Sequence, residues 1–233
     1  MTKVKNYLSE KYDKFYENNN SKWRYICSID KSDNIIKLCN KYPHSKILEI
    51  GAGDGSILQN LEKQNFGKEY TALDISKSAI DIIRTKKIKK LKNSSTFDGY
   101  NLPFSSDEFH LVILSHVIEH LEYPRKLIYE AIRVGRYVFV EVPCEDNLRL
   151  SKDFTENATG HINFYNPTTI RRLLQTCGLS ILEALLSNPN MRVYKYSYGN
   201  IAFLHYFPKN IALKVSKNLA SKFFTYHYSL LLK

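Results

Sequence analysis

Three of the chain's nine glycines stand at every second position of the segment LEIGAGDGS, residues 48–56. Because glycine has no β-carbon, such a turn lets a ligand come close to the backbone. A P-loop would need a lysine directly after its last glycine, and no lysine follows Gly55, so nucleoside triphosphate hydrolysis is excluded. A dinucleotide is disfavoured because Glu49, two residues before Gly51, would repel a diphosphate. A carboxylate at this place favours a cationic ligand.

A second set of side chains that could do chemistry lies in SHVIEHL, residues 115–121, with a later histidine at His161. If a helix begins at His116, then Glu119 and His120 follow three and four residues later and share its face. His161 follows a later predicted strand and reaches the same crevice. Three imidazoles and a carboxylate can hold a divalent metal, or one imidazole can act as a general base for a hydroxyl or amine.

The elements that must position these residues alternate between strands and helices. Helical spacing follows the first two strands, and a later helix begins at Pro167 with Asn166 as its cap and ends at Gly178. Another helix is predicted at 124–134, closed by Gly135. This alternation predicts an α/β fold, with a mostly parallel sheet, helices on both faces and ligands at the carboxyl ends of the strands. Apolar runs predict the strands at 46–50, 70–75, 109–114, 137–142, 180–186 and 225–232.

Over residues 47–186 the chain resembles the class I S-adenosylmethionine-dependent methyltransferases. The family's first motif, an acid before a glycine-rich turn, corresponds to residues 49–55. The second motif is an acid that ends the second strand, here Asp74, nineteen residues beyond Gly55. The third is an acid before a Leu-Pro-Phe turn, here Asp98 to Phe104. The resemblance implies a Rossmann-like fold with a seven-stranded, mostly parallel sheet, an antiparallel C-terminal strand, and S-adenosylmethionine as cofactor.

The resemblance also implies a role for each matching residue. Glu49 would orient the methionine ammonium, while Gly51 and Gly53 let the backbone cradle that moiety. Asp74 would accept from both ribose hydroxyls, and Asp98 from the adenine amino group. The chain departs from the family where a strand that usually opens with Phe-Asp opens with Phe-His, at residues 109 and 110. The remaining cofactor contacts are expected from Ala52, Ile75, Gly99 and Ser115.

The histidine segment carries a resemblance of its own. The pattern E-x-x-E-H with a later histidine occurs in the metal-dependent small-RNA 3′-end 2′-O-methyltransferases, and a similar one in ubiquinone-pathway O-methyltransferases. Here His116 replaces the first glutamate, and a nitrogen-rich set favours Mn²⁺, Fe²⁺ or Zn²⁺ over Mg²⁺. Without a metal, the catalytic residue would be a histidine, with His120 and His161 ahead of His116. The predicted metal ligands are His116, Glu119, His120 and His161.

Composition indicates one globular domain. The chain has 43% hydrophobic and 24% charged residues, and no apolar run approaches the ~20 residues that span a bilayer. The charged start, MTKVKNYLSEKYDK, does not fit a secretory signal, so we expect a cytoplasmic protein. Four cysteines without CxxC spacing favour reduced thiols.

The net charge of +11 favours an acidic partner. We expect the lysine-rich run 86–92 to be a solvated helix end rather than a phosphate-binding patch. No nucleic-acid module accompanies the core, so we expect O-methylation of a small acidic metabolite, such as a phosphorylated, nucleotide-linked or sugar intermediate. The alternatives are a metal-dependent RNA 3′-end 2′-O-methyltransferase and a non-catalytic methyltransferase-like scaffold subunit. The sequence leaves the acceptor atom and the oligomeric state open.

The single domain 1–233 divides into four predicted parts. Residues 1–44 form a helical cover over the cofactor and 45–186 the cofactor-binding core. Residues 187–222 form a substrate-side insertion, which includes a basic amphipathic helix near 209–223, and 223–233 form the last strand. The predicted pocket aromatics of the cover are Tyr12, Tyr16, Trp23 and Tyr25, and the insertion offers Met191, Arg192, Tyr194, Tyr196 and Tyr198.

Overall fold

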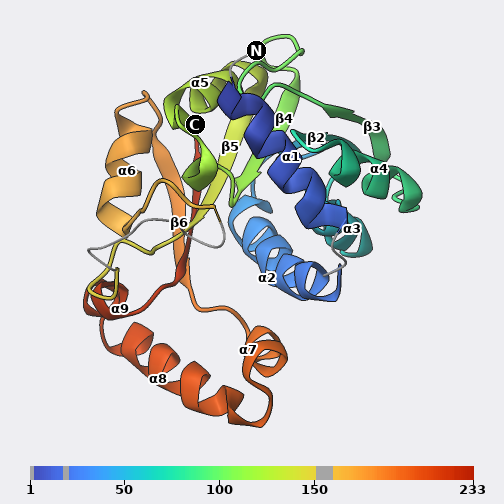
Figure 1. Ribbon diagram of the computed structural model, residues 1–233. Coiled ribbons are helices and arrows are strands. Elements are labelled where there is room, and N and C mark those ends of the chain that lie inside the picture. Colours follow the sequence, from blue (N-terminus) through green and yellow to red (C-terminus); the bar gives the residue numbers. More distant parts are fainter. Residues whose placement is uncertain (1–2, 18–20, 151–159) are drawn as a thin grey trace.

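The computed structural model describes residues 3–17, 21–150 and 160–233, and its centre is a seven-stranded sheet in the order β3-β2-β1-β4-β5-β7-β6 (Figure 1). The strands β1 to β5 pair in parallel, and β7 runs antiparallel to both β5 and β6. This confirms the predicted Rossmann-like methyltransferase fold. The strands are β1 (Lys46–Ile50), β2 (Glu69–Asp74), β3 (Leu91–Thr96), β4 (Phe109–Ser115), β5 (Gly135–Pro143), β6 (Ile181–Ser187) and β7 (His227–Leu232).

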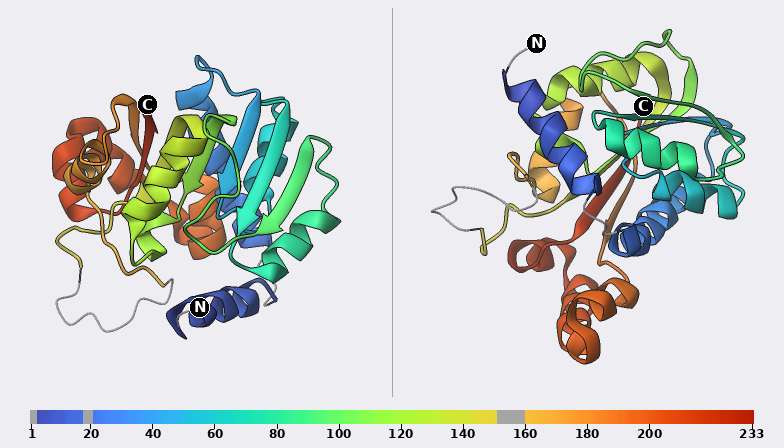
Figure 2. Two further views of the ribbon diagram at one scale, coloured as in Figure 1. Left: turned by 90° about the horizontal axis from the view of Figure 1, so that it is seen from above. Right: turned by 45° about the vertical axis from the view of Figure 1, so that its right-hand side comes forward.

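Helices cover both faces of the sheet (Figure 2). Because successive strand residues point to opposite faces, Ile47 and Leu48 enter two different cores. The core that contains Ile47 lies beneath α2, α3 and α4, and the core that contains Leu48 lies beneath α5 and α6. These helices are α2 (Ser21–Cys39), α3 (Ser56–Lys63), α4 (Lys77–Thr85), α5 (Pro124–Val134) and α6 (Pro167–Gln175).

The helix α1 (Lys3–Glu17) lies across the edge at which the parallel strands end, called the carboxyl edge below. Asp13 accepts hydrogen bonds from Ser76 Oγ at 2.6 Å and from the backbone N–H of Ser78 at 3.1 Å. Ser9 Oγ donates to the carbonyl of Ile75 at 3.1 Å. Since Ser76 and Ile75 directly follow β2, these bonds hold α1 over the place where a ligand is expected.

Three helices between β6 and β7 form an appendage, α7 (Met191–Tyr198), α8 (Ala202–Val215) and α9 (Lys217–Phe223), which projects beyond the sheet (Figures 1 and 2). In the antiparallel pairings His227 lies opposite both Pro143 and Ser187, so the appendage leaves and rejoins the sheet at the carboxyl edge. The prediction of one helix near 209–223 is wrong. Ser216 is extended, ends α8 and caps α9 by accepting from the N–H of Leu219.

Two of the predicted helices begin at the residue that the sequence indicated. The α5 helix spans 124–134 as predicted, but Gly135 does not close it with a left-handed turn; its φ of −122° is extended and it is the first residue of β5. The α6 helix begins at Pro167, and Asn166 caps it by accepting from the N–H of Thr168 and of Thr169. Gly178, with φ +91°, follows the end of α6 by three residues.

Two other local expectations are corrected. No α-helix begins at His116, which has a left-handed φ of 57°; only a 3₁₀ turn, Ile118–His120, follows. The lysine run 86–92 begins at the helix end but does not stay there: Lys86 is the C-cap of α4, which ends at Thr85, and the rest of the run leads into β3. Lys86 itself is half-buried, 3.3 Å from the carboxylate of Asp54, while Lys87, Lys89 and Lys92 are exposed.

All four cysteines are free thiols, as expected. Among the described residues, no helix has the length and the apolar composition needed to cross a membrane.

Candidate functional site

The glycine turn after β1 is left-handed at all three glycines, with φ of 69° at Gly51, 55° at Gly53 and 73° at Gly55. Residues with a β-carbon adopt this conformation at a cost. A β-carbon on Gly51 would lie 2.6 Å from Val117 Cγ2, and one on Gly53 would lie 2.6 Å from the Tyr16 hydroxyl. The turn therefore needs glycine both for its backbone conformation and because the loop after β4 and helix α1 come so close.

Glu49 lies inside β1 with 1% of its surface exposed, and its Oε2 atom has no hydrogen-bond partner among the described residues. Burial raises the pKa of this carboxyl well above its ordinary value, and Lys31 partly opposes the shift. A buried acceptor without a donor is costly, and a cationic ligand would satisfy it. The site therefore fits the ammonium of the cofactor that the sequence predicted.

Asp74 ends β2 and is 4% exposed. Its carboxylate accepts from the backbone N–H of Gly53 at 2.7 Å and of Ser76 at 2.9 Å. Burial raises the pKa of Asp74 to about 6, although these bonds favour the charged form. Each carboxylate oxygen keeps a further lone pair, so the group can still accept from ribose hydroxyls. Beside it, the N–H of Ala52 donates to the carbonyl of Leu73 at 3.0 Å.

The predicted adenine residues lie on the loop after β3. The Asp98 carboxylate accepts from two backbone N–H groups of its own loop, at 2.9 and 2.6 Å, which fixes the loop as a turn. A β-carbon on Gly99, whose φ is 88°, would lie 3.6 Å from Ile75 Cγ2, so these two residues are neighbours. Ser115 is buried, and its Oγ donates to Glu141 at 3.3 Å.

Two of the four predicted pocket aromatics face the carboxyl edge. Tyr16 contacts the glycine turn, and the ring of Tyr12 stands edge-on to His120 with centroids 5.8 Å apart. Burial, together with the nearby Glu119 and Asp74 charges, raises the pKa of Tyr12. The other two lie elsewhere. The rings of Trp23 and Tyr196 of α7 are tilted by 34° with centroids 5.3 Å apart, and the Tyr25 hydroxyl accepts from Lys63 of α3.

Glu119, His120 and His161 bring three ligand atoms to within 4.8 Å of one another. Both carboxylate oxygens of Glu119 are buried without a hydrogen bond from the described residues, although His116 Nδ1 lies 3.3 Å from Oε1. Burial opposes the charge of Glu119, yet the neighbouring His116 imidazole lowers its pKa. The donor set, two imidazole nitrogens and one carboxylate, fits a divalent ion of the nitrogen-preferring kind. We call these three residues the proximal group.

The two histidines of the proximal group are oriented by their Nδ1 atoms. His120 Nδ1 lies 3.1 Å from the carbonyl of Gly160, and His161 Nδ1 lies 2.5 Å from Glu145. An acceptor on Nδ1 fixes the proton there and leaves Nε2 free to bind a metal or take a proton. Burial lowers the pKa of His120, so this imidazole is neutral at neutral pH.

His116 belongs to a second group, with Glu141 and His227, which we call the distal group. Its Nε2 lies 3.5 Å from Glu141 Oε1, so the imidazole stands between the Glu119 and Glu141 carboxylates. Burial opposes its positive charge, but the two carboxylates outweigh burial and raise the pKa of His116. The predicted set of four metal ligands is thus divided: three converge in the proximal group, and His116 connects that group to Glu141.

Glu141, Glu145 and His227 were not among the predicted site residues. Glu141 gave a signal, because an acid inside the apolar run YVFVEV must be buried with partners. It accepts from Asn34 Nδ2 at 2.8 Å and from Ser229 Oγ at 2.6 Å. His227 gave none, since a histidine at the start of a strand is ordinary.

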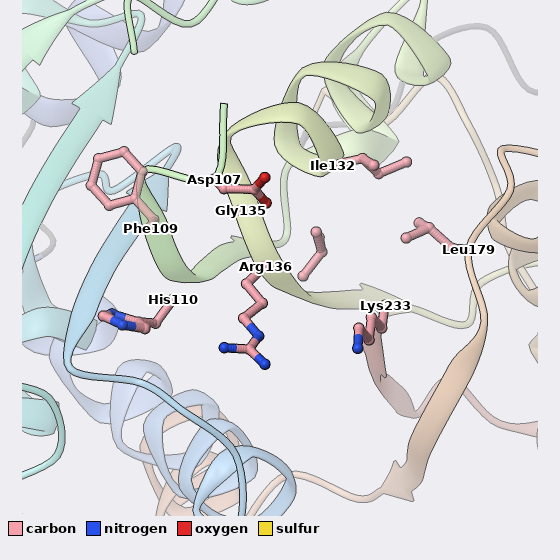
Figure 3. A pocket seen from close by; sticks show the side chains of 9 residues that line it. Asp107, Phe109, His110, Ile132, Gly135, Arg136, Leu179 and Lys233 are labelled. Carbon is pink, nitrogen blue, oxygen red and sulfur yellow. The ribbon is translucent and has the colours of Figure 1, made fainter. Parts of the chain in front are cut away.

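A pocket away from these groups lies at the opposite edge of the sheet (Figure 3). Its lining residues include Phe109 and Gly135, which open β4 and β5, and Lys233, which follows β7. None of the described site residues lines it, so it lies apart from the predicted chemistry.

Comparison of the sequence with known protein families identifies the family to which the chain belongs. A family model described as a methyltransferase domain matches residues 6–184. The uncharacterized protein MJ1123 of Methanocaldococcus jannaschii is 33% identical over 187 residues, which are 76% of this chain and 80% of that protein. The putative methyltransferase YrhH of Bacillus subtilis is 28% identical over 93 residues, 39% of this chain and 52% of that protein.

Solved structures share the fold. Phosphoethanolamine N-methyltransferase 2 of Haemonchus contortus, solved with phosphomonomethylethanolamine and S-adenosylhomocysteine, superposes with a TM-score of 0.61 at 15% identity. The match covers 88% of this chain and 52% of that one.

Proposed function

Because this chain belongs to the class I S-adenosylmethionine-dependent methyltransferases, we propose that it transfers the methyl group to an oxygen of a small acidic metabolite. The observation that carries the proposal is His120: a half-buried, neutral imidazole whose Nδ1 is held at the carbonyl of Gly160, which leaves Nε2 for the acceptor, at the edge where the cofactor residues gather. An acceptor hydroxyl must lose its proton as it is methylated, and a neutral imidazole can take it.

We assign cofactor binding to Glu49, Gly51, Gly53, Asp74 and Asp98. When bound, S-adenosylmethionine supplies a methyl group on a sulfonium. Glu49 Oε2, which has no hydrogen-bond partner among the described residues, would hold its ammonium, and Asp74 its ribose. Tyr16 lies against Gly53, so α1 would exclude water from the same space.

The local charge supports an acidic acceptor. A β-carbon on Gly160 would lie 3.6 Å from the Lys11 ammonium and 3.8 Å from His120 Nδ1, so a cation from α1 and the proposed base both lie against Gly160. Such a cation would attract a phosphate or carboxylate. The overall charge of +11 acts in the same direction.

A labelling screen tests the acceptor. Radiolabelled S-adenosylmethionine is incubated with the enzyme and with phosphorylated, nucleotide-linked and sugar metabolites, and in parallel with RNA oligonucleotides. We expect label on an acidic metabolite. Label on the 3′ end of RNA would contradict this proposal and would support the alternative activity, that of a metal-dependent RNA 3′-end 2′-O-methyltransferase.

The proximal group offers a second arrangement, in which Glu119, His120 and His161 hold a divalent ion. The buried Glu119 oxygens accept no hydrogen bond from the described residues, and this favours a metal because a cation would satisfy them. The ion would lower the pKa of an acceptor hydroxyl and so replace the base.

Chelation distinguishes the two arrangements. If His120 is the base, His120→Gln lowers kcat by about 10²–10⁴-fold. Chelator then has no effect, and the acidic limb of the pH–rate profile lies below the ordinary imidazole value of 6.5 because burial lowers the pKa of His120. If a metal is held, chelator abolishes activity, Mn²⁺ restores it, and alanine at any of the three positions is inactive. If kcat falls by less than about tenfold in every variant, neither a base nor a metal is needed. The enzyme would then act only by holding the acceptor close to the methyl group.

A further inference from the structure

The appendage carries a continuous apolar surface that no described part of the chain covers. On α8, Phe203, Phe207, Ile211 and Val215 recur every fourth residue and therefore share one face. Their exposed fractions are 51, 54, 61 and 77%. Side chains of this size are normally buried, and an exposed row of them marks an interaction site.

The apolar surface continues onto α9 and the loop after β5. Leu219 and Phe223 of α9 are also four residues apart and are 54 and 45% exposed. Together with Ile211 and Val215 of α8 they line one shallow groove that contains no charged residue. Leu148 on the loop after β5 is 73% exposed, and its N–H donates to the carbonyl of Lys222 at 2.9 Å, so this loop lies beside α9.

The charged side chains of the appendage are all positive. The sequence contains no Asp or Glu after Glu183, whereas the stretch 188–224 contains six Lys and Arg. Arg192 is turned toward the body, where it lies 3.4 Å from Asp30. Lys214, Lys217 and Lys222 are exposed among the apolar side chains of α8 and α9.

We propose that the appendage docks on the surface of an anionic lipid bilayer, with the apolar face of α8 and α9 in the lipid and the lysines on the acidic headgroups. An apolar face rimmed by lysine is the composition that helices lying in a membrane interface use. A second copy of the chain fits poorly, because a symmetric contact would bring the same lysines face to face. Nucleic acid would match the charge but would leave the apolar side chains exposed.

Docking would also orient the enzyme. The appendage leaves and rejoins the sheet at the carboxyl edge, the same edge as the glycine turn and the proximal group. A bilayer bound by the appendage would therefore lie on the side of the molecule from which the acceptor enters.

Sedimentation with vesicles tests the proposal and requires neither cofactor nor acceptor. The wild-type chain should sediment with vesicles of equal parts phosphatidylcholine and phosphatidylglycerol, and not with phosphatidylcholine alone. Phe207→Asn with Ile211→Asn and Leu219→Asn should weaken binding at least about tenfold. Lys214→Gln with Lys217→Gln and Lys222→Gln should weaken it by roughly fivefold for each lysine removed.

A matched control removes the same charge elsewhere. Lys87→Gln with Lys89→Gln and Lys92→Gln changes three exposed lysines far along the sequence from the appendage, and it should lower binding much less than the appendage lysine variant. Circular dichroism and thermal unfolding show that each variant is folded.

Four results would overturn the proposal. The first is no vesicle binding by the wild-type chain, and the second is equal losses in both lysine variants. The third is a wild-type dimer in sedimentation equilibrium that the apolar variant disperses, which would make the face a contact between copies. The fourth is retention on an RNA oligonucleotide that needs the appendage lysines but not its apolar side chains.

Discussion

Single side chains at the carboxyl edge differ in whether they have a partner. The Asp74 carboxylate accepts two backbone N–H groups, while Glu49 and Glu119 have buried oxygens without a hydrogen bond from the described residues. An unsatisfied buried acceptor costs about 1–3 kcal/mol. Glu49 and Glu119 therefore point to ligands that complete their bonding, and they were predictable because an acid in an apolar segment demands a partner. The distal group was not, because its residues come from the loop after β4, from β5 and from β7, and meet only in the folded sheet.

Asp74 gives the first prediction at this scale. Asp74→Ala should weaken the binding of both S-adenosylmethionine and its demethylated product by about 1–3 kcal/mol, because charged hydrogen bonds to the ribose are lost. Titration calorimetry measures this, with Asp81→Ala on the partly exposed face of α4 as control. Since the pKa of Asp74 is about 6, affinity in the wild-type chain should fall as pH drops below 6, where the carboxylate is protonated. Unchanged affinity in Asp74→Ala would remove the ribose assignment.

The helices and strands were predictable from the sequence where their apolar residues recur with a regular period. The strand β3 was missed because its sequence, LKNSST, is polar and only Ser94 is buried, as suits a strand at the edge of the sheet. The loop at His116 was also missed, because its left-handed φ is held by tertiary contacts rather than by local sequence. The backbone N–H of His116 donates to the carbonyl of Glu141 at 2.9 Å. Long-range bonds of this kind cannot be read from spacing along one segment.

Glu141 joins several elements, and its removal gives the second prediction. Its carboxylate accepts from Asn34 of α2, Ser115 of β4 and Ser229 of β7. Glu141→Ala should lower the free energy of unfolding by about 3–5 kcal/mol, because three buried donors lose their acceptor. Urea unfolding measures the change, and Glu69→Ala, an exposed glutamate on β2, is the matched control.

The pH dependence of that stabilisation has a definite sign. Burial opposes the charge of Glu141, but bonds from His116 and other donors lower its pKa from 4.5 to about 2. A lowered carboxyl pKa contributes stability above pH 4.5 that is lost as pH falls from 4.5 toward 2. The difference between wild type and Glu141→Ala should therefore shrink over that interval. A difference that is constant with pH would mean that the charge of Glu141 is not what stabilises the fold.

At the scale of the whole molecule, the alternation of strands and helices was enough to predict the sheet and its layers, since few topologies satisfy the rule of right-handed crossovers. The arrangement of the appendage was not predictable. Its helices are short, Ser216 interrupts them, and their apolar residues face outward rather than into a core. An apolar period indicates a helix but does not say which surface buries it.

The net charge of +11 gives the last prediction. If an acidic acceptor is drawn to the carboxyl edge by the field of the protein, its KM should rise roughly threefold to tenfold between low salt and physiological salt, because charges are screened beyond about 8 Å. The acceptor found in the labelling screen serves as probe, and the KM for S-adenosylmethionine is followed in the same titration. Lys11→Gln should reproduce much of the rise at low salt, since Lys11 and His120 both lie against Gly160, whereas Lys87→Gln, at an exposed position of the lysine run, should not. Equal effects in the two variants would mean that the charge acts on the acceptor only from a distance. A KM that is independent of salt would contradict the proposed attraction of an acidic acceptor by the charge of the chain.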